Sequence, residues 1–200
     1  MKCALIGEKL GHSYSKLIHE AFGLYSYDLV SLPRDRVGEF MENGDFDAFN
    51  VTIPYKRTVI PYCSYISPEA QKIGSVNTVI RTQDGLHGFN TDYFGFKSMA
   101  TRAGIDFSGK KVVVLGSGGT SLTAKAVAAD CGADRITVVS RSGEYNYENL
   151  EKLSDCEVLI NTTPVGMYPN NGSSAVKLDS FPRCEAVLDV IYNPLRTELI

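Results

Sequence analysis

The chain has 200 residues, of which 44% are hydrophobic and 22% are charged, so it can bury a core and is not predicted to be disordered. Lys and Arg number 20 against 23 Asp and Glu, for a net charge of -3. That balance argues against a nucleic-acid binder that depends on a broad basic face. No segment approaches the ~20 apolar residues of a membrane span. We therefore expect neither a nucleic-acid partner nor a membrane, and the oligomeric state stays open.

The five cysteines are scattered, odd in number and include no C-x-x-C pair. This predicts neither a zinc site nor a disulfide framework, but free thiols in a reducing cytosol. The apolar run at 3–6 is too short for the core of a signal peptide, so we expect a cytoplasmic protein. The three histidines have no metal-ligand spacing, and no metal is expected: His12, His19 and His87.

In the first half, short apolar runs alternate with polar stretches of helical composition. The pattern predicts strands at 3–7, 27–32 and 49–53 and helices at 16–22 and 36–42. Runs at 76–81 and 86–90, joined through Gln83-Asp84-Gly85, predict a hairpin. Strands that alternate with helices favour a parallel sheet covered on both faces. The first domain is predicted to span residues 1–99 and to be an α/β domain.

The second half begins after a predicted helix at 93–103. A strand at 112–115 leads into Gly116-Ser117-Gly118-Gly119, and a helix is predicted at 120–131. Further strands are predicted at 135–140, 158–161 and 186–191. This order indicates a Rossmann-type dinucleotide-binding domain over residues 100–200.

The glycine turn has the residues that a dinucleotide site needs. Gly116 permits a tight turn, and Gly118 lets the backbone approach a pyrophosphate. The next helix would aim its free N–H groups and its positive dipole end at that anion. The third glycine of the usual pattern is replaced by Ser121. The alternative is a plain tight turn in an α/β protein that binds no nucleotide.

The end of the second strand of this domain bears on the choice of cofactor. NAD enzymes usually place an acidic residue there, whereas NADP enzymes supply cations for the 2′-phosphate. This chain has Ser140-Arg141-Ser142, and the Arg141 guanidinium can hold a phosphate. The sequence thus favours NADP. A solvated surface arginine is the alternative, and Glu144 nearby keeps NAD possible.

Four polar clusters, at 12–15, 50–56, 74–78 and 88–92, sit where loops should leave the strands of the first half. The hydroxyls of Ser13 and Ser15 could both donate to one carboxylate, or could cap a helix, with Ser15 as the cap and Ser13 free to bind. Lys56 follows a strand end, where a lysine partly removed from water can move protons. Asn77 could bind a sugar-like hydroxyl, and Asp92 could hold Lys56. Ordinary loop and helix-cap roles remain open for each.

Seven stretches together resemble the shikimate dehydrogenases: HSYS, NVTIPYK, GSVNT, GFNTD, VLGSGGTS, NTTPVGM and DVIYNP, in that order between Gly7 and Pro194. The resemblance implies a catalytic substrate domain followed by an NADP domain. It also implies NADP-dependent reduction of 3-dehydroshikimate to shikimate, a reaction of chorismate and aromatic amino acid biosynthesis.

The resemblance also implies a role for each matching residue. Lys56 and Asp92 match the catalytic pair. The substrate carboxylate would be bound by Ser13 and Ser15, its ring hydroxyls by Thr52, Asn77 and Asp92, and its border would be formed by Tyr192. The cofactor would be bound by the glycine turn (Gly116, Ser117, Gly118, Gly119, Thr120), by Ser140, Arg141 and Ser142, and by the loop Thr162, Thr163, Pro164, Val165, Gly166 and Met167.

Three features depart from the family. Lys16 replaces a proline, Ser140-Arg141-Ser142 replaces Asn-Arg-Thr, and the family continues past Ile200 with helices that carry a substrate-binding glutamine. Two other functions therefore remain open. One is a quinate/shikimate dehydrogenase that uses NAD, and the other is a non-catalytic ligand-binding module derived from the enzyme.

Overall fold

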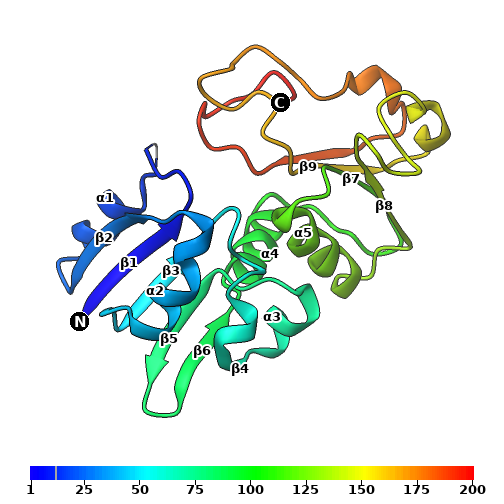
Figure 1. Ribbon diagram of the computed structural model, residues 1–200. Coiled ribbons are helices and arrows are strands. Elements are labelled where there is room, and N and C mark those ends of the chain that lie inside the picture. Colours follow the sequence, from blue (N-terminus) through cyan, green and yellow to red (C-terminus); the bar gives the residue numbers. More distant parts are fainter. Residues whose placement is uncertain (12) are drawn as a thin grey trace. The chain divides into compact units, whose positions relative to one another are not determined.

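The computed structural model describes residues 1–11 and 13–200, and the chain divides into two units, Met1–Thr91 and Asp92–Ile200. Each unit has its own β-sheet (Figure 1). The predicted division between residues 99 and 100 falls inside α4 (Asp92–Arg102), which is the first element of the second unit. No helix within residues 1–11 and 13–200 combines the length and apolar composition needed to span a membrane.

The first unit is built on a mixed six-stranded sheet in the order β2-β1-β3-β5-β6-β4. Its strands are β1 (Lys2–Gly7), β2 (Ser26–Ser31), β3 (Ala48–Val51), β4 (Cys63–Ile66), β5 (Thr78–Thr82) and β6 (Gly85–Phe89). β1 lies parallel to β2 and β3, as the alternating pattern predicts. The predicted hairpin is β5 and β6, and it adds antiparallel pairs to the sheet. β4 was not predicted, because two of its four residues are exposed and its apolar pattern is short.

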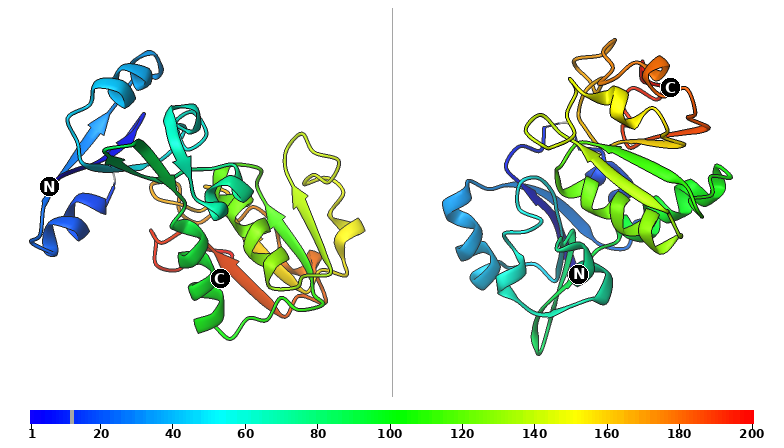
Figure 2. Two further views of the ribbon diagram at one scale, coloured as in Figure 1. Left: turned by 90° about the horizontal axis from the view of Figure 1, so that it is seen from below. Right: turned by 90° about the vertical axis from the view of Figure 1, so that its right-hand side faces the viewer.

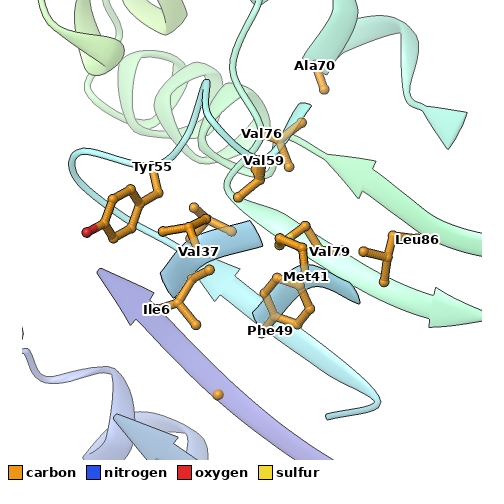
Figure 3. Close-up of a cluster of buried hydrophobic side chains, with 12 residues drawn as sticks. Ile6, Val37, Met41, Phe49, Tyr55, Val59, Ala70, Val76, Val79 and Leu86 are labelled. Atoms are coloured by element: carbon orange, nitrogen blue, oxygen red, sulfur yellow. The ribbon is translucent and has the colours of Figure 1, made fainter. Parts of the chain in front are cut away.

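Helices cover this sheet and close its core. They are α1 (Ser15–Ala21), α2 (Val37–Asn43) and α3 (Pro68–Ile73). Two short 3₁₀ turns accompany them: η1 (Arg34–Arg36) precedes α2, and η2 (Ile60–Tyr62) precedes β4. Val37 and Met41 are four residues apart, so both face the sheet from one side of α2. They pack with Ile6, Phe49 and Val79, and none of the five is more than 2% exposed (Figure 3).

The register brings several chain segments to one edge of this sheet. Ile6 of β1 pairs with Val51 of β3, so both strands end at this edge. Thr78 begins β5 opposite Asn50 and pairs with Phe89 at the end of β6. The loops after β1, β3 and β6 and before β5 therefore share this edge, and they contain the four polar clusters.

The second unit holds a parallel four-stranded sheet in the order β10-β9-β7-β8. Its strands are β7 (Lys111–Leu115), β8 (Arg135–Val139), β9 (Val158–Asn161) and β10 (Ala186–Asp189). The helix α5 (Gly119–Asp130) contacts β7 and β8, and α4 lies beside α5 (Figure 2). The first strand is central and its successors lie on either side of it, as in the dinucleotide-binding fold. The predicted Rossmann-type arrangement is confirmed.

The connection from β8 to β9 lacks the α-helix that usually joins parallel strands. Residues 140–157 contain the 3₁₀ turn η3 (Leu150–Leu153) and no α-helix, and β8 forms the sheet edge. A second 3₁₀ turn, η4 (Leu178–Ser180), lies in the connection to β10. Leu153, Val176, Phe181 and Leu199 bury one face of the sheet from these and other irregular segments. Helices therefore cover one face of this sheet and loops cover the other.

Candidate active site

A chain of hydrogen bonds joins the polar clusters of the first unit. The Tyr27 hydroxyl donates to Oδ1 of Asn50 at 2.6 Å, and Nδ2 of Asn50 donates to Oγ1 of Thr78 at 3.1 Å. The Ser15 side chain favours a lower pKa for the Tyr27 hydroxyl, against the larger effect of burial. Burial raises the pKa of Tyr27, so its hydroxyl stays a neutral donor. Sequence reasoning gave no role to Tyr27 or Asn50, although Asn50 opens the motif NVTIPYK.

The same network continues through the Asn77 side chain. Thr91 donates its backbone N–H to Oδ1 of Asn77 at 2.9 Å, and Nδ2 of Asn77 donates to Oγ1 of Thr91 at 3.0 Å. Asn77 is only 7% exposed, so this pairing fixes the orientation of its amide. Nδ2 of Asn90 donates to the Ser75 carbonyl at 2.8 Å. The clusters at 74–78 and 88–92 are thus held together, up to the residue before Asp92.

The segment that carries Thr52 and Lys56 forms a tight turn against this network. The Tyr55 N–H donates to the Thr52 carbonyl at 2.9 Å, and the Val76 N–H donates to the Lys56 carbonyl at 2.8 Å. Tyr55 belongs to the buried cluster of the first unit (Figure 3). Its hydroxyl donates to the Leu32 carbonyl at 2.6 Å, which anchors the turn. Thr52 and Lys56 stay half-buried. Both are therefore held by backbone contacts to the edge that bears Asn77.

The two serines near the start of α1 have roles that differ from the expected ones. Oγ of Ser13 accepts the N–H of Ser15 at 3.2 Å, so Ser13 supports the helix start. Ser15 is the first helical residue and not the cap, which is Tyr14 without a side-chain cap bond. Both serines are half-buried. His12, from the same cluster, lies outside the described residues.

In the second unit, the last residues of the four strands pair with one another, and the predicted cofactor residues follow them. Leu115 of β7 pairs with Val139 of β8 and with Asn161 of β9, and Asn161 pairs with Asp189 of β10. The next residue in each strand leaves the sheet at this carboxyl edge. β7 and β9 flank the point where the strand order reverses, which is where open α/β sheets bind ligands.

The glycine turn after β7 has the geometry that its sequence predicts. Gly116 has φ +99°, a left-handed conformation, and its N–H donates to the Val139 carbonyl at 2.8 Å. A Cβ at Gly116 would lie 2.9 Å from Oγ1 of Thr162, whereas one at Gly118 would meet nothing within 4 Å. Gly118 therefore leaves open space before the first N–H groups of α5. Ser121 is buried and donates its hydroxyl to the Gly118 carbonyl at 2.6 Å, which explains a serine at the third position.

The residues after β8 form an open turn. Ser140 donates its N–H to the Tyr145 carbonyl at 3.1 Å, and Arg141 and Ser142 are exposed. Burial raises the pKa of Tyr147, and the positive charge of nearby Arg141 opposes that rise. Arg141 is thus an accessible cation directly beyond the end of β8, where a 2′-phosphate reader is expected. Glu144 is exposed in the same loop.

The loop after β9 is fixed by side chains at its first residues. Oγ1 of Thr162 donates to the Leu115 carbonyl at 2.6 Å, which ties the loop to the glycine turn. Oδ1 of Asn161 accepts the N–H and the hydroxyl of Thr163, at 3.0 and 2.7 Å. The Thr163 hydroxyl in turn accepts the Val165 N–H at 3.2 Å. Beyond these anchors, the exposed residues of the loop are Pro164, Val165 and Met167.

Asp189, which sequence reasoning left without a role, joins this loop to the segment after β10. Its Oδ1 accepts from Nδ2 of Asn161 at 3.1 Å and from the Ile191 N–H at 3.0 Å. Its Oδ2 accepts from the Thr197 hydroxyl at 2.7 Å. Asp189 opens the motif DVIYNP, which was the available signal. Tyr192, which follows shortly after β10 ends at Asp189, is 66% exposed.

The predicted site residues therefore fall into two groups. The structure gathers Ser15, Thr52, Lys56 and Asn77 at one sheet edge of the first unit, and Ser13 adjoins Ser15. It gathers the glycine turn, Ser140 and Thr162 at the carboxyl edge of the sheet in the second unit. Asp92 and Tyr192 belong to the second unit by chain position.

Comparison with known proteins identifies the relatives of this arrangement. Residues 5–79 match the model of the shikimate dehydrogenase substrate binding domain. A shikimate dehydrogenase (NADP(+)) from Clostridium perfringens (strain SM101 / Type A) is 38% identical over 219 residues, covering 98% of this chain and 80% of the relative. Because this chain has only 200 residues, the relative contains residues within the matched region that have no counterpart here.

Solved structures give the same result. A chorismate mutase/shikimate 5-dehydrogenase fusion protein from Clostridium acetobutylicum superposes with a TM-score of 0.92 at 37% identity, covering 99% of this chain and 79% of that one. Shikimate 5-dehydrogenase from Thermus thermophilus, in complex with NADP(H) and shikimate, superposes with a TM-score of 0.84 at 30% identity, covering 97% and 80%. Both matches extend over nearly the whole of this chain.

Proposed function

Because the chain belongs to the shikimate dehydrogenase family, we propose that it is an oxidoreductase that catalyses the reversible, NADP-dependent reduction of 3-dehydroshikimate to shikimate. This reaction belongs to chorismate and aromatic amino acid biosynthesis. The observation that carries the proposal is the hydrogen-bonded joining of the family's polar motifs at one edge of the first sheet, together with a glycine turn at the strand-order reversal of the second.

The substrate has one carboxylate and several hydroxyls, and the polar edge of the first unit suits both. We assign the carboxylate to the hydroxyls of Ser13 and Ser15, which are half-buried. We assign the ring hydroxyls to Thr52, Asn77 and Asp92, and a bordering role to Tyr192. The described hydrogen bonds use one of the two amide hydrogens of Asn77, which leaves the other for a ligand.

The second unit has groups suited to each part of NADP. The open space at Gly118 and the start of α5 fit a pyrophosphate, with Ser117, Gly119 and Thr120 as neighbours in the turn. Arg141, with Ser140 and Ser142, suits the 2′-phosphate. The loop Thr162–Met167 would hold the nicotinamide side, positioned by Asn161. When bound, the reduced cofactor supplies the hydride that reduces the C3 ketone of the substrate.

Lys56 is the proposed acid–base group. In ketone reduction, the charged Lys56 ammonium stabilises the substrate oxygen as it becomes negative and then donates a proton to it. In alcohol oxidation, neutral Lys56 accepts the hydroxyl proton. Asp92 is proposed to pair with Lys56 as its carboxylate partner and to hold the lysine in place.

Steady-state rates with purified protein test this function and its alternatives. Shikimate and quinate would each be offered with NADP and with NAD, and cofactor reduction would be followed by absorbance. We expect the highest kcat/KM for shikimate with NADP. A higher value for quinate with NAD would support the quinate/shikimate dehydrogenase instead. Binding of shikimate without turnover in any combination would support a non-catalytic module.

We also propose a cytoplasmic location. The five cysteines are free thiols in the structure, which suits a reducing compartment. Fractionation of cells that express the tagged protein would test this, since recovery outside the cytoplasmic fraction would contradict it.

A further inference from the structure

Two cysteines occupy equivalent places before neighbouring parallel strands of the second unit. Val158 of β9 pairs with Ala186 of β10, and Cys156 and Cys184 each lie two residues earlier. The pairing continues toward them, because the Glu185 N–H donates to the Glu157 carbonyl at 2.8 Å. Neighbouring strands lie about 4.8 Å apart, and disulfides join Cα atoms that are roughly 4.4–6.8 Å apart. The backbone spacing therefore suits a disulfide.

The two side chains are also oriented alike. Sγ of Cys156 donates to the Val158 carbonyl and Sγ of Cys184 donates to the Ala186 carbonyl, both at 3.3 Å. Each bond runs from a residue to the carbonyl two positions later. Both cysteines pack into one apolar cluster, which includes Phe181. Equal orientation on adjacent strands places the two sulfur atoms on the same face of the sheet.

The two thiols differ in accessibility. Cys156 is only 1% exposed. Cys184 is half-buried and lines a cavity of about 390 Å³, together with Leu178, Pro182 and Glu185. A small reagent can therefore reach Cys184 from the cavity, whereas Cys156 is buried and does not line it.

The two thiols also differ in pKa, and the more accessible thiol has the lower value. The neighbouring Cys156 side chain lowers the pKa of Cys184, whereas the Cys184 side chain and burial raise the pKa of Cys156. Cys184 is thus the first of the two to become a thiolate, which is the nucleophilic form. The cysteines of the first unit are less reactive, because burial raises the pKa of both Cys3 and Cys63.

We propose that Cys184 and Cys156 form a redox site that is oxidised to an intramolecular disulfide by a low-molecular-weight disulfide. The Cys184 thiolate attacks one sulfur of the oxidant, which forms a mixed disulfide and releases the first small thiolate. Cys156 then loses its proton and attacks Sγ of Cys184, which forms the protein disulfide and releases the second small thiolate. Both small thiolates take up the two protons that the cysteines lose, so two protein thiols are oxidised and one small disulfide is reduced to two thiols.

Oxidised glutathione is the probe, applied to the folded full chain. We expect the number of titratable thiols to fall from five to three, with Cys156 and Cys184 joined in the digest seen by mass spectrometry. Cys156→Ser should stop at a glutathione adduct on Cys184. Cys184→Ser should leave Cys156 unmodified. Cys131→Ser, which changes the half-buried cysteine at the end of α5, should oxidise at the rate of the unchanged chain.

Two measurements keep the outcome decisive. Circular dichroism checks that each variant folds. If Cys156→Ser does not fold, Cys156→Ala takes its place. Thermal unfolding of the oxidised and reduced chains should show a higher midpoint after oxidation, because a disulfide that fits constrains the unfolded chain. The proposal is overturned if glutathione stays on Cys184 of the unchanged chain without cross-linking, if Cys131 reacts first, or if oxidation lowers the unfolding midpoint.

Discussion

The two units build their parts of the site in different ways. In the first, polar side chains hold one another: Tyr27, Asn50 and Asn77 belong to a partly buried chain of hydrogen bonds. In the second, backbone shape dominates, with a left-handed Gly116 and an open Gly118 before α5. Binding and stability in the first unit should therefore be reduced by substitutions that remove polar atoms. In the second unit, they should be reduced by substitutions that add a side chain to the glycine turn. Single substitutions in each unit can test this contrast.

Removal of the proposed proton donor should have the largest effect. We expect Lys56→Ala to lower kcat by about 10²–10⁴-fold, since general acid–base catalysis is typically worth that much. KM for shikimate should change far less. Arg57→Ala is the matched control, because it removes an exposed cation one residue away. Steady-state kinetics measure both, and near-normal turnover of Lys56→Ala would remove Lys56 from the mechanism.

A methyl group added to the glycine turn tests the backbone side of the contrast. Gly116→Ala forces an alanine to adopt φ +99° and to crowd Oγ1 of Thr162 at 2.9 Å. We expect it to lower the free energy of unfolding by roughly 1–3 kcal/mol. Gly118→Ala meets open space, so it should keep stability but weaken NADP binding. Urea unfolding and cofactor titration separate the two effects, and equal stability of both variants would show that the turn carries no constraint.

Arg141→Ala tests a place where the second unit relies on a side chain. A charge-assisted hydrogen bond is worth about 1.5–3 kcal/mol, so KM for NADP should rise roughly 10–100-fold. KM for NAD should hardly change, because NAD lacks the 2′-phosphate. Arg183→Ala, an exposed arginine before β10, is the control. Similar losses for both cofactors would mean that Arg141 does not distinguish them.

Much of the fold could be predicted because its signals are local. Apolar runs such as 112–115 and the glycines after them identify a strand, a turn and a helix without knowledge of the rest of the chain. β4 and α3 were missed because they are short and their burial depends on distant partners. The irregular cover of the second sheet was also missed, since Val176 and Phe181 are placed by tertiary packing and not by a repeat.

The site could be predicted in its residue types but not in its connections. Motifs identified Ser15, Asn77 and Lys56, yet nothing local shows that Tyr27, from β2, reaches Asn50. Likewise, the local sequence around Asp189 shows only an acidic residue after an apolar run. Its role follows from the strand register, which places Asp189 beside Asn161. Such residues act through partners far along the chain, and only the folded sheet brings those partners together.

The hydroxyl of Tyr27 is the clearest test of that hidden network. Tyr27→Phe keeps the ring that stacks on His19 but removes the donor to Asn50. An unpaired acceptor costs about 1–3 kcal/mol when it is buried, and Asn50 is half-buried, so we expect a loss of roughly 1–2 kcal/mol in unfolding free energy. KM for shikimate should rise modestly. Tyr65→Phe is the control on an exposed tyrosine of the same unit, and equal stability of both variants would show that the network contributes nothing.

An ion-pair cluster at the opposite edge of the second sheet gives the smallest expected effect. Asp155, before β9, accepts from Nζ of Lys111 at 2.8 Å and from Nη2 of Arg135 at 2.6 Å. Hydrogen bonds from Lys111 and then Arg135 lower the pKa of Asp155 to about 2. Its folded pKa is therefore below the unfolded value of about 4, so its contribution to stability is complete above that value.

This contribution should disappear as the pH falls from about 4 to about 2, because protonated Asp155 no longer attracts either cation. Asp155→Asn should cost roughly 0.5–1 kcal/mol at neutral pH, the usual size for pairs that are partly open to solvent. The cost should shrink in acid, whereas the exposed control Asp134→Asn should change little at either pH. Urea unfolding at both pH values measures this. An Asp155→Asn cost that stays constant with pH would mean that the residue stabilises the strand ends by packing and not by charge, and the second unit would then depend on shape at both edges of its sheet.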